Sequence, residues 1–448
     1  MRRVFSCPIL SSLFLLSLGA CSSPTPQQAQ LPAESGGAAP SSPQQPSGSQ
    51  PSGSQPGEKQ PGESLPPLKL PELPAGLPNA SFVVAANLDG EGPDELILWS
   101  PSGLSFWAQG EVGPYALAPS HQPDEPALEG MPNKAVVADL DGDGRDDVVL
   151  ASGMSRDTLK APVQVMAYRL KGEAGKHTLK VDVLYRQPSE RADVSALALM
   201  DLERDQKREL LLAHFDSKYF VQAFALPLKR EGDPLAGPLQ AVPLSRVRMA
   251  TSWAVGPFGP KGSPMLVAGR PYGEEKLAPG DIFLVSGEQR VPIPAELGVR
   301  SVTVGDGDGD GTSEIYFGDG WHFEYGTKAR GRLNVAQVVE GKWLTSLIED
   351  TPGQYEVGQL VITDVEGDGT PELLASGDQY LNLYWKEKRG WMVRRVSSGS
   401  EFAVVRTSKG KAVAVAGSPV KLIPLEGRVN GKPVSKEVSP PGVDRPKR

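Results

Sequence analysis

The feature that most constrains the fold of this chain is a short acidic loop, set between two apolar runs, that recurs along the sequence. The clearest copy spans residues 135–152 and reads AVVADLDGDGRDDVVLAS. Its flanking runs are short and rich in β-branched residues, which favours buried strands over helices. The loop carries aspartates at positions one, three, five and nine and a glycine at position six: Asp139, Asp141, Asp143, Asp147 and Gly144. Acids at this density repel one another unless a cation or water screens them, and hard oxygen ligands favour Ca²⁺ over softer metals.

Further copies bring the number of units to seven, spaced about fifty residues apart. Their loops begin at Asn87, Asp139, Asp201, Gly256, Asp306, Asp364 and about Arg406. Five loops are acidic, whereas the copies at residues 253–269 and 402–417 lack the acids. Fifty residues hold about four strands, the content of one propeller blade, and a closed ring of blades leaves no long exposed edge. The repeats therefore predict an all-β, seven-bladed β-propeller over residues 75–426, with an open β-solenoid as the alternative.

The first residues have the pattern of a signal peptide. Two arginines precede an apolar stretch over residues 4–18, which is too short for a membrane span and ends in the small residues of LGAC. This ending resembles the lipobox of bacterial lipoproteins, which implies that residues 1–20 are removed and Cys21 is acylated. By the same resemblance, Ser22 favours sorting to the outer membrane of a Gram-negative cell. An ordinary secreted protein is the alternative.

Low-complexity segments flank the predicted propeller. Residues 21–74 are rich in Ser, Pro, Gln and Gly and cannot bury enough apolar surface to fold, so we expect a disordered tether. Residues 427–448 are basic and Pro-rich, and we expect a disordered, solvated tail. The chain has only two cysteines, and Cys7 leaves with the signal peptide, so the mature chain has no pair for an internal disulfide.

The acidic units resemble FG-GAP or VCBS repeats, which form the β-propeller of integrin α subunits and occur in many bacterial secreted proteins. The resemblance covers residues 80–425 and rests on the D-x-D-x-D-G-x-x-D/E loop between two apolar strands. It implies that each loop joins two strands of a blade and binds a structural Ca²⁺ through positions one, three, five and nine, plus the backbone carbonyl at position seven. Carried over residue by residue, the implied ligands are Asp139, Asp141, Asp143 and Asp147 in the second loop, Asp306, Asp308, Asp310 and Glu314 in the fifth, Asp364, Glu366, Asp368 and Glu372 in the sixth, and Asn87, Asp89, Glu91 and Glu95 in the first.

The third acidic loop departs from this pattern. It keeps the spacing in Asp201, Glu203, Asp205 and Glu209. Arg204, Lys207 and Arg208 stand among these acids, however, and Gln206 replaces the glycine. Built-in cations can neutralise such a loop without a metal.

Two other interpretations of the loops are an EF-hand and a hairpin turn without an ion. An EF-hand begins in the same way but needs a carboxylate at position twelve, where this chain has Leu150, Phe317 and Ala375, so the chemistry excludes it. The remaining alternative is a hairpin turn in which aspartates cap backbone amides. That alternative predicts the same propeller without ions.

Other function classes find little support in the sequence. The net charge is −8 and the acids cluster in the loops, so the chain lacks the basic face that a nucleic acid requires. The four histidines are scattered, and neither a GxSxG motif nor a P-loop occurs. An aromatic cluster, Trp321, His322, Phe323 and Tyr325, would suit a sugar-binding surface, although packing within a blade is the simpler interpretation.

These observations predict a monomeric, membrane-anchored, calcium-stabilised β-propeller that is a non-catalytic binding or scaffold module. We expect an outer-membrane lipoprotein on the periplasmic face or the cell surface, with a protein or glycan ligand that the sequence does not identify. The alternative is a polysaccharide-degrading enzyme, a lyase or hydrolase on a propeller scaffold, for which the sequence offers no motif. A third hypothesis, a structural partner in an envelope assembly, differs only in having a protein as its ligand.

Overall fold

The structure is a computed structural model in which the chain divides into two compact units, Met1–Glu63 and Ser64–Arg448. The described residues all lie in the second unit and are 76–110, 114–117, 126–153, 162–172, 178–187, 193–202, 204–217, 219–229, 231–258, 263–273, 280–320, 330–352, 357–377 and 380–434. The predicted signal peptide, Cys21, the tether and the aromatic cluster that begins at Trp321 lie outside them.

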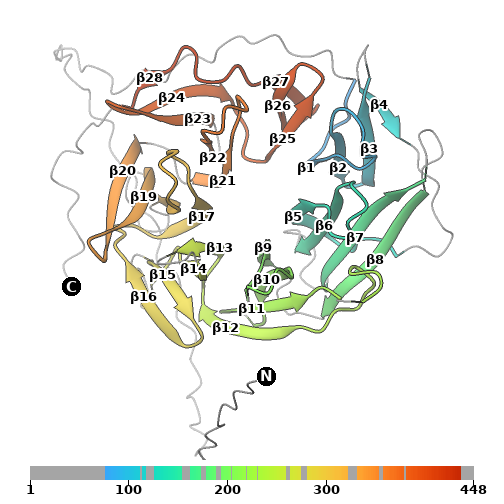
Figure 1. The fold of residues 1–448 in the computed structure, drawn as a ribbon, viewed down its shortest axis with the longest axis horizontal. Coiled ribbons are helices and arrows are strands. Elements are labelled where there is room, and N and C mark those ends of the chain that lie inside the picture. The colour runs from blue at the N-terminus through green and yellow to red at the C-terminus, as the bar shows by residue number, and fades with distance from the viewer. Residues whose placement is uncertain are drawn as a thin grey trace, which may run out of the picture. The chain divides into compact units, whose positions relative to one another are not determined.

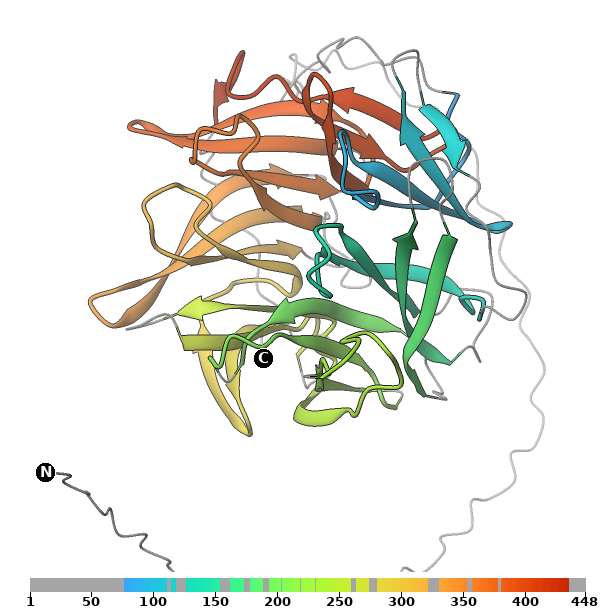
Figure 2. The same ribbon diagram turned by 45° about the vertical axis from the view of Figure 1, so that its right-hand side comes forward.

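Seven antiparallel sheets follow one another in chain order around a ring (Figure 1), which confirms the predicted seven-bladed β-propeller. The first strand of each sheet lies nearest the centre of the ring, and neighbouring sheets pack face against face (Figure 2). No helix among the described residues is long and apolar enough to cross a membrane.

The strands of the first four blades have the following bounds. Blade one contains β1 (Phe82–Ala86), β2 (Glu95–Ser100), β3 (Gly103–Gln109) and β4 (Pro114–Leu117). Blade two contains β5 (Met131–Ala138), β6 (Asp147–Gly153), β7 (Val163–Lys171) and β8 (Thr178–Gln187). Blade three contains β9 (Val194–Met200), β10 (Glu209–Phe215), β11 (Phe220–Pro227) and β12 (Val242–Arg248). Blade four contains β13 (Ser252–Phe258), β14 (Ser263–Gly269), β15 (Ile282–Ser286) and β16 (Gln289–Ile293).

The last three blades differ in strand number. Blade five contains β17 (Val299–Gly305), β18 (Glu314–Gly320), β19 (Arg330–Val339) and β20 (Lys342–Pro352). Blade six contains β21 (Val357–Thr363), β22 (Glu372–Gly377), β23 (Tyr380–Glu387) and β24 (Gly390–Ser397), and β28 (Lys432–Pro433) adds a fifth strand at its edge. Blade seven has three described strands, β25 (Phe402–Thr407), β26 (Gly410–Val415) and β27 (Lys421–Pro424).

The core of the described part consists of seven apolar clusters, one between each pair of neighbouring blades. Side chains alternate between the two faces of a strand, so each strand can contribute to the clusters on both sides. In β1, Val84 packs toward the second blade, whereas Val83 packs toward the seventh. The cluster between blades seven and one also contains Leu77 and Leu422, and it closes the ring.

The C-terminal segment corrects one expectation from the sequence. The disordered tail was expected to begin at residue 427, but residues 427–434 belong to the folded unit. β28 pairs with β24 through the partners Met392↔Pro433 and Val393↔Lys432. The sequence did not predict this strand, because a two-residue strand at the edge of a sheet needs no apolar pattern of its own.

Candidate cation-binding loops

Each acidic loop joins the first and second strands of its blade, as the sequence predicted. In blade five, the ladder between β17 and β18 ends at the pair Gly305↔Glu314, so the loop lies between those residues. The other four acidic blades pair the same two positions, the residue before position one and the residue at position nine. Because the first strands of propeller blades all run in one direction, the five loops lie on one face of the ring.

Positions four and six have left-handed backbone in all five loops. Glycines hold both positions in four loops, with φ between 68° and 85°. In the third loop, Arg204 (φ 60°) and Gln206 (φ 65°) adopt the same conformation without being glycine. Two left-handed residues turn the chain back on itself, so the amides of the loop point inward. The glycine motif predicted this requirement at position six but not at position four.

In the four acidic loops that begin with an aspartate, its carboxylate accepts these inward amides. In the fifth loop, Asp306 Oδ1 accepts the N–H groups of Gly309 (2.7 Å) and Asp310 (3.1 Å), and its Oδ2 accepts that of Gly311 (2.8 Å). Matching bonds are made by Asp139, Asp201 and Asp364 in the second, third and sixth loops. This capping is what the ion-free turn predicts, so it does not by itself distinguish a turn from a metal site.

The carboxylate at position nine is buried in every acidic loop. The residue exposures range from 0% to 8%, for Glu95, Asp147, Glu209, Glu314 and Glu372. In four loops this carboxylate accepts the N–H group of position two, namely Leu88 (2.8 Å), Leu140 (2.8 Å), Leu202 (2.9 Å) and Val365 (2.7 Å).

The fifth loop is the exception to this rule. Its position two is Gly307, and the ring of Tyr316 fills the space beside it, since an added Cβ would lie 2.8 Å from Tyr316 Cζ. The Tyr316 hydroxyl donates to Glu314 Oε2 at 3.1 Å. Glu314 therefore has a different partner from the other carboxylates at position nine.

Three acidic side chains of the fifth loop converge. Oxygens of Asp306, Asp308 and Glu314 lie within 4.8 Å of one another. Asp308 Oδ1 is buried and has no hydrogen-bond partner. Burial, followed by the charge of Asp308, raises the pKa of Glu314 to about 7, and burial followed by the charge of Asp310 raises the pKa of Asp308. Within the described residues no Lys or Arg forms an ion pair with this loop, and the nearby charge of Lys386 only partly opposes the rise in the pKa of Asp308. The oxygen-only donor set fits a hard divalent cation.

The second loop also gathers three carboxylates, but a lysine lies against it. Oxygens of Asp139, Asp141 and Asp147 lie within 4.8 Å of one another. The Lys171 ammonium, at the end of β7, lies 2.8 Å from Asp141 Oδ2 and 2.5 Å from Asp143 Oδ2. Burial raises the pKa of Asp147 to about 6. A cation in this loop would compete with Lys171.

Basic side chains pair with the acids of the third and sixth loops. In the third, the Lys207 ammonium lies 3.0 Å from Asp205 Oδ2, as its sequence suggested, while Glu203 lies outside the described residues. In the sixth, the guanidinium of Arg428 contacts Asp368 Oδ1 at 3.3 Å and Glu372 Oε1 at 2.6 Å. Arg428 thus supplies positive charge in the sixth loop, where the sequence predicted a calcium ion.

The first loop is hydrogen-bonded to the second loop. Asn87 N–H donates to Asp146 Oδ2 of the second loop at 2.8 Å, and Asp146 N–H returns a 2.8 Å bond to Asn87 O. Burial, followed by the charge of Asp89, raises the pKa of Glu95 to about 7, and Asn87 Oδ1 is buried without a partner. Its acids are nevertheless not among the groups of three that converge within 4.8 Å in the described part of the chain.

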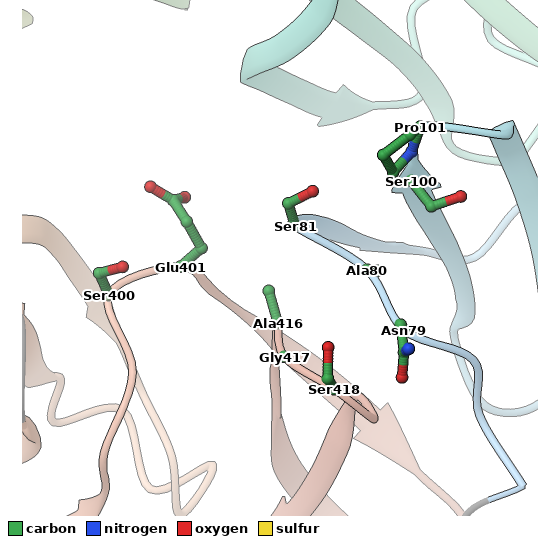
Figure 3. Close-up of a pocket in the computed structure, with 10 residues that line it drawn as sticks. All are labelled: Asn79, Ala80, Ser81, Ser100, Pro101, Ser400, Glu401, Ala416, Gly417 and Ser418. Atoms are coloured by element: carbon green, nitrogen blue, oxygen red, sulfur yellow. The ribbon is translucent and has the colours of Figure 1, made fainter. Parts of the chain in front are cut away.

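A recess of about 380 Å³ lies where blades one and seven meet (Figure 3). Its lining includes the polar residues Asn79, Ser81, Ser100, Ser400, Glu401 and Ser418. Ser81 precedes β1 and Glu401 precedes β25, whereas the acidic loops follow the first strands, so the recess lies at the opposite end of the strands. Burial raises the pKa of Glu401, which the nearby Lys134 partly opposes.

No protein-family model matches the chain, and no curated protein matches it. The resemblance to FG-GAP and VCBS repeats therefore rests on the loops themselves. Among solved structures, the chain is similar to an Agrocybe aegerita lectin described as recognising non-reducing terminal N-acetylglucosamine. The two share 12% identity at a TM-score of 0.44, over 74% of this chain and 84% of the lectin chain. A likeness of this degree says nothing about the ligand of the present chain.

Proposed function

We propose that this chain is a non-catalytic binding or scaffold module: a lipid-anchored propeller of the bacterial envelope whose acidic face holds structural calcium, first of all in the fifth loop. The observation that supports the calcium is the partnerless, buried Asp308 Oδ1 among converging carboxylates. When bound, Ca²⁺ would balance the charges of this loop through Asp306, Asp308, Asp310 and Glu314. These residues then fix the turn between β17 and β18 and perform no chemistry on a substrate.

The second loop is the next candidate, and its occupancy depends on Lys171. An ammonium that already pairs with Asp141 and Asp143 must move before a divalent ion can enter. We therefore place a weaker site at Asp139, Asp141, Asp143 and Asp147. The first loop, Asn87 to Glu95, follows it in order, because its acids do not converge in the described structure.

Calorimetric titration of Ca²⁺ into the chelator-treated full-length chain tests this proposal. We expect one tight site per chain and a rise in melting temperature, because binding to the folded state alone stabilises it by mass action. Asp308→Asn should abolish the tight site, whereas the matched change Asp205→Asn, in the third loop, should leave it intact. Absence of heat, with unchanged melting, would show that the acidic loops are turns only.

The anchor and the location are proposed from the LGAC sequence before Ser22. Labelled palmitate should be incorporated into the chain expressed in a Gram-negative host and should be lost in Cys21→Ser. Retention of label in that variant would argue against lipidation at this cysteine.

A further inference from the structure

The sixth loop and the C-terminal segment form a unit that differs from the other acidic loops. The segment Gly427–Val434, called here the C-terminal strap, crosses the sixth loop before β28 joins blade six. The strap lies far from the loop in sequence, and Arg428 is 56 residues from Glu372. Its contacts are therefore a product of the fold and not of a local turn.

Arg428 contacts four positions of the loop. Its side chain donates from Nε to Glu372 Oε1 (2.6 Å) and from Nη2 to the carbonyl of Thr370 (2.6 Å). Nη2 also lies 3.3 Å from Asp368 Oδ1, and the backbone N–H of Arg428 donates to Glu366 Oε1 at 2.6 Å. Positions three, five, seven and nine thus direct their oxygens at one residue, as they would at an ion.

Two further cations, Lys411 and Arg394, lie near the sixth loop. Lys411 Nζ donates to the carbonyl of Asp364. Arg394 is 2% exposed and lies 3.9 Å from Glu426, immediately before the strap. Arg428 is therefore ion-paired with two acids of the sixth loop, Asp368 and Glu372, whereas the fifth loop has no ion pair among the described residues.

Two glycines allow the strap to approach this closely. At Gly427 (φ +67°) an added Cβ would lie 2.1 Å from Glu366 Oε1. At Gly431 it would lie 2.1 Å from Cη2 of Trp385. The strap ends with the N–H of Val434 bonded to the carbonyl of Trp391 at 3.0 Å. Side chains at either glycine would push the strap off the blade.

We propose that the sixth loop is not a calcium site but the docking site of the C-terminal strap, in which the guanidinium of Arg428 takes the place of the ion. The donor set does not fit a bound calcium, because the oxygens at positions five, seven and nine are already used by the guanidinium. The sixth loop thereby fastens the chain end to blade six. This proposal goes beyond the calcium proposed for the fifth loop and does not depend on it.

Full-length variants distinguish the strap from a metal site. In the wild-type background, Asp364→Asn should leave the number of bound Ca²⁺ ions unchanged. Arg428→Gln should lower the melting temperature without calcium by about 3 to 6 °C, because it leaves the buried carboxylate of Glu372 without its ion-pair partner. The same variant should gain one Ca²⁺ site per chain, which Asp364→Asn should remove again.

Two controls separate these effects from general damage. Arg246→Gln makes the same charge change at a surface pair with Asp216 and should alter neither quantity. Arg428→Lys keeps a charge without the fork of the guanidinium, so it should lose part of the stability and gain no calcium site. Loss of a calcium site from wild type on Asp364→Asn would overturn the proposal. So would an Arg428→Gln variant with wild-type melting and wild-type stoichiometry.

Discussion

The third acidic loop shows, at the scale of single residues, what the glycines of the other loops achieve. Gln206 is exposed and adopts a left-handed φ of 65°, a conformation that costs a residue with a Cβ roughly 1–2 kcal/mol. It takes part in the capping through its backbone N–H, which Asp201 accepts. The conformation is therefore imposed by the turn.

Gln206→Gly should stabilise the protein by about 0.5–1 kcal/mol, since the relief of strain exceeds the added entropy of the unfolded chain. Urea unfolding of the full chain, with chelator present, measures this gain. Gln206→Ala keeps the Cβ and should give no gain. Equal stability of the glycine and alanine variants would show that the left-handed conformation costs nothing there.

Individual ligand positions were only partly predictable from sequence. The spacing placed the described acidic side chains in the correct loops, because that pattern is local to nine residues. The partners that decide whether a loop needs an ion are not local: Lys171 is 28 residues from Asp143, and Arg428 is 56 from Glu372. Tyr316 gave a weaker local signal, since Gly307 replaces the apolar residue that the other acidic loops have at position two.

At the scale of elements, neighbouring blades are joined by a reciprocal pair of hydrogen bonds, one to an aspartate side chain and one between backbones, that the motif did not reveal. Asp146, at position eight of the second loop, accepts the N–H of Asn87 and donates to its carbonyl. Asp94, at position eight of the first loop, makes the same two bonds to Arg406 of blade seven, at 2.6 and 2.9 Å. Position eight is Arg208, Ser313 and Pro371 in the other acidic loops. An acid at this position therefore connects consecutive blades.

Asp146→Ala should cost about 1–2 kcal/mol of unfolding free energy, because the amide of Asn87 loses a charged acceptor in a partly buried place. Asp146→Asn retains an acceptor oxygen and should lose less. The shift of the denaturant midpoint measures both. If the alanine variant unfolds at the wild-type midpoint, the side chain does not contribute to the connection between loops.

The first two strands of each blade were predictable from the repeat, because an apolar run on each side of a loop predicts a hairpin. The exceptions lie where the ring begins and ends. Blade seven has three described strands, and its hairpin has a two-residue turn at Ser408 and Lys409 in place of an acidic loop. The strand β28 completes blade six from the far end of the chain. Neither feature has a counterpart in the repeat, so the repeat could not predict it.

At the scale of the whole propeller, the ring is closed by non-covalent contacts between the start of blade one and the end of blade seven. Ala80 and Gly417 exchange backbone bonds of 3.0 and 2.9 Å, and Val420 N–H donates to the carbonyl of Pro78 at 3.1 Å. Leu77, 4% exposed, packs in the same cluster as Val420. Both cysteines of the chain lie outside the described residues, so no disulfide contributes to this closure in the described part.

Leu77→Ala should therefore destabilise the whole propeller, although the residue precedes the first strand. A buried leucine reduced to alanine costs about 2–4 kcal/mol through lost burial and the cavity that remains. Thermal and urea unfolding should both show the loss, with a single transition, because each blade depends on apolar clusters shared with its neighbours. Val338→Ala, at a side chain 52% exposed on β19, is the matched control and should change stability by less than about 0.5 kcal/mol. Equal losses of stability in the two variants would mean that the segment before β1 packs on the propeller without contributing to the closure of the ring.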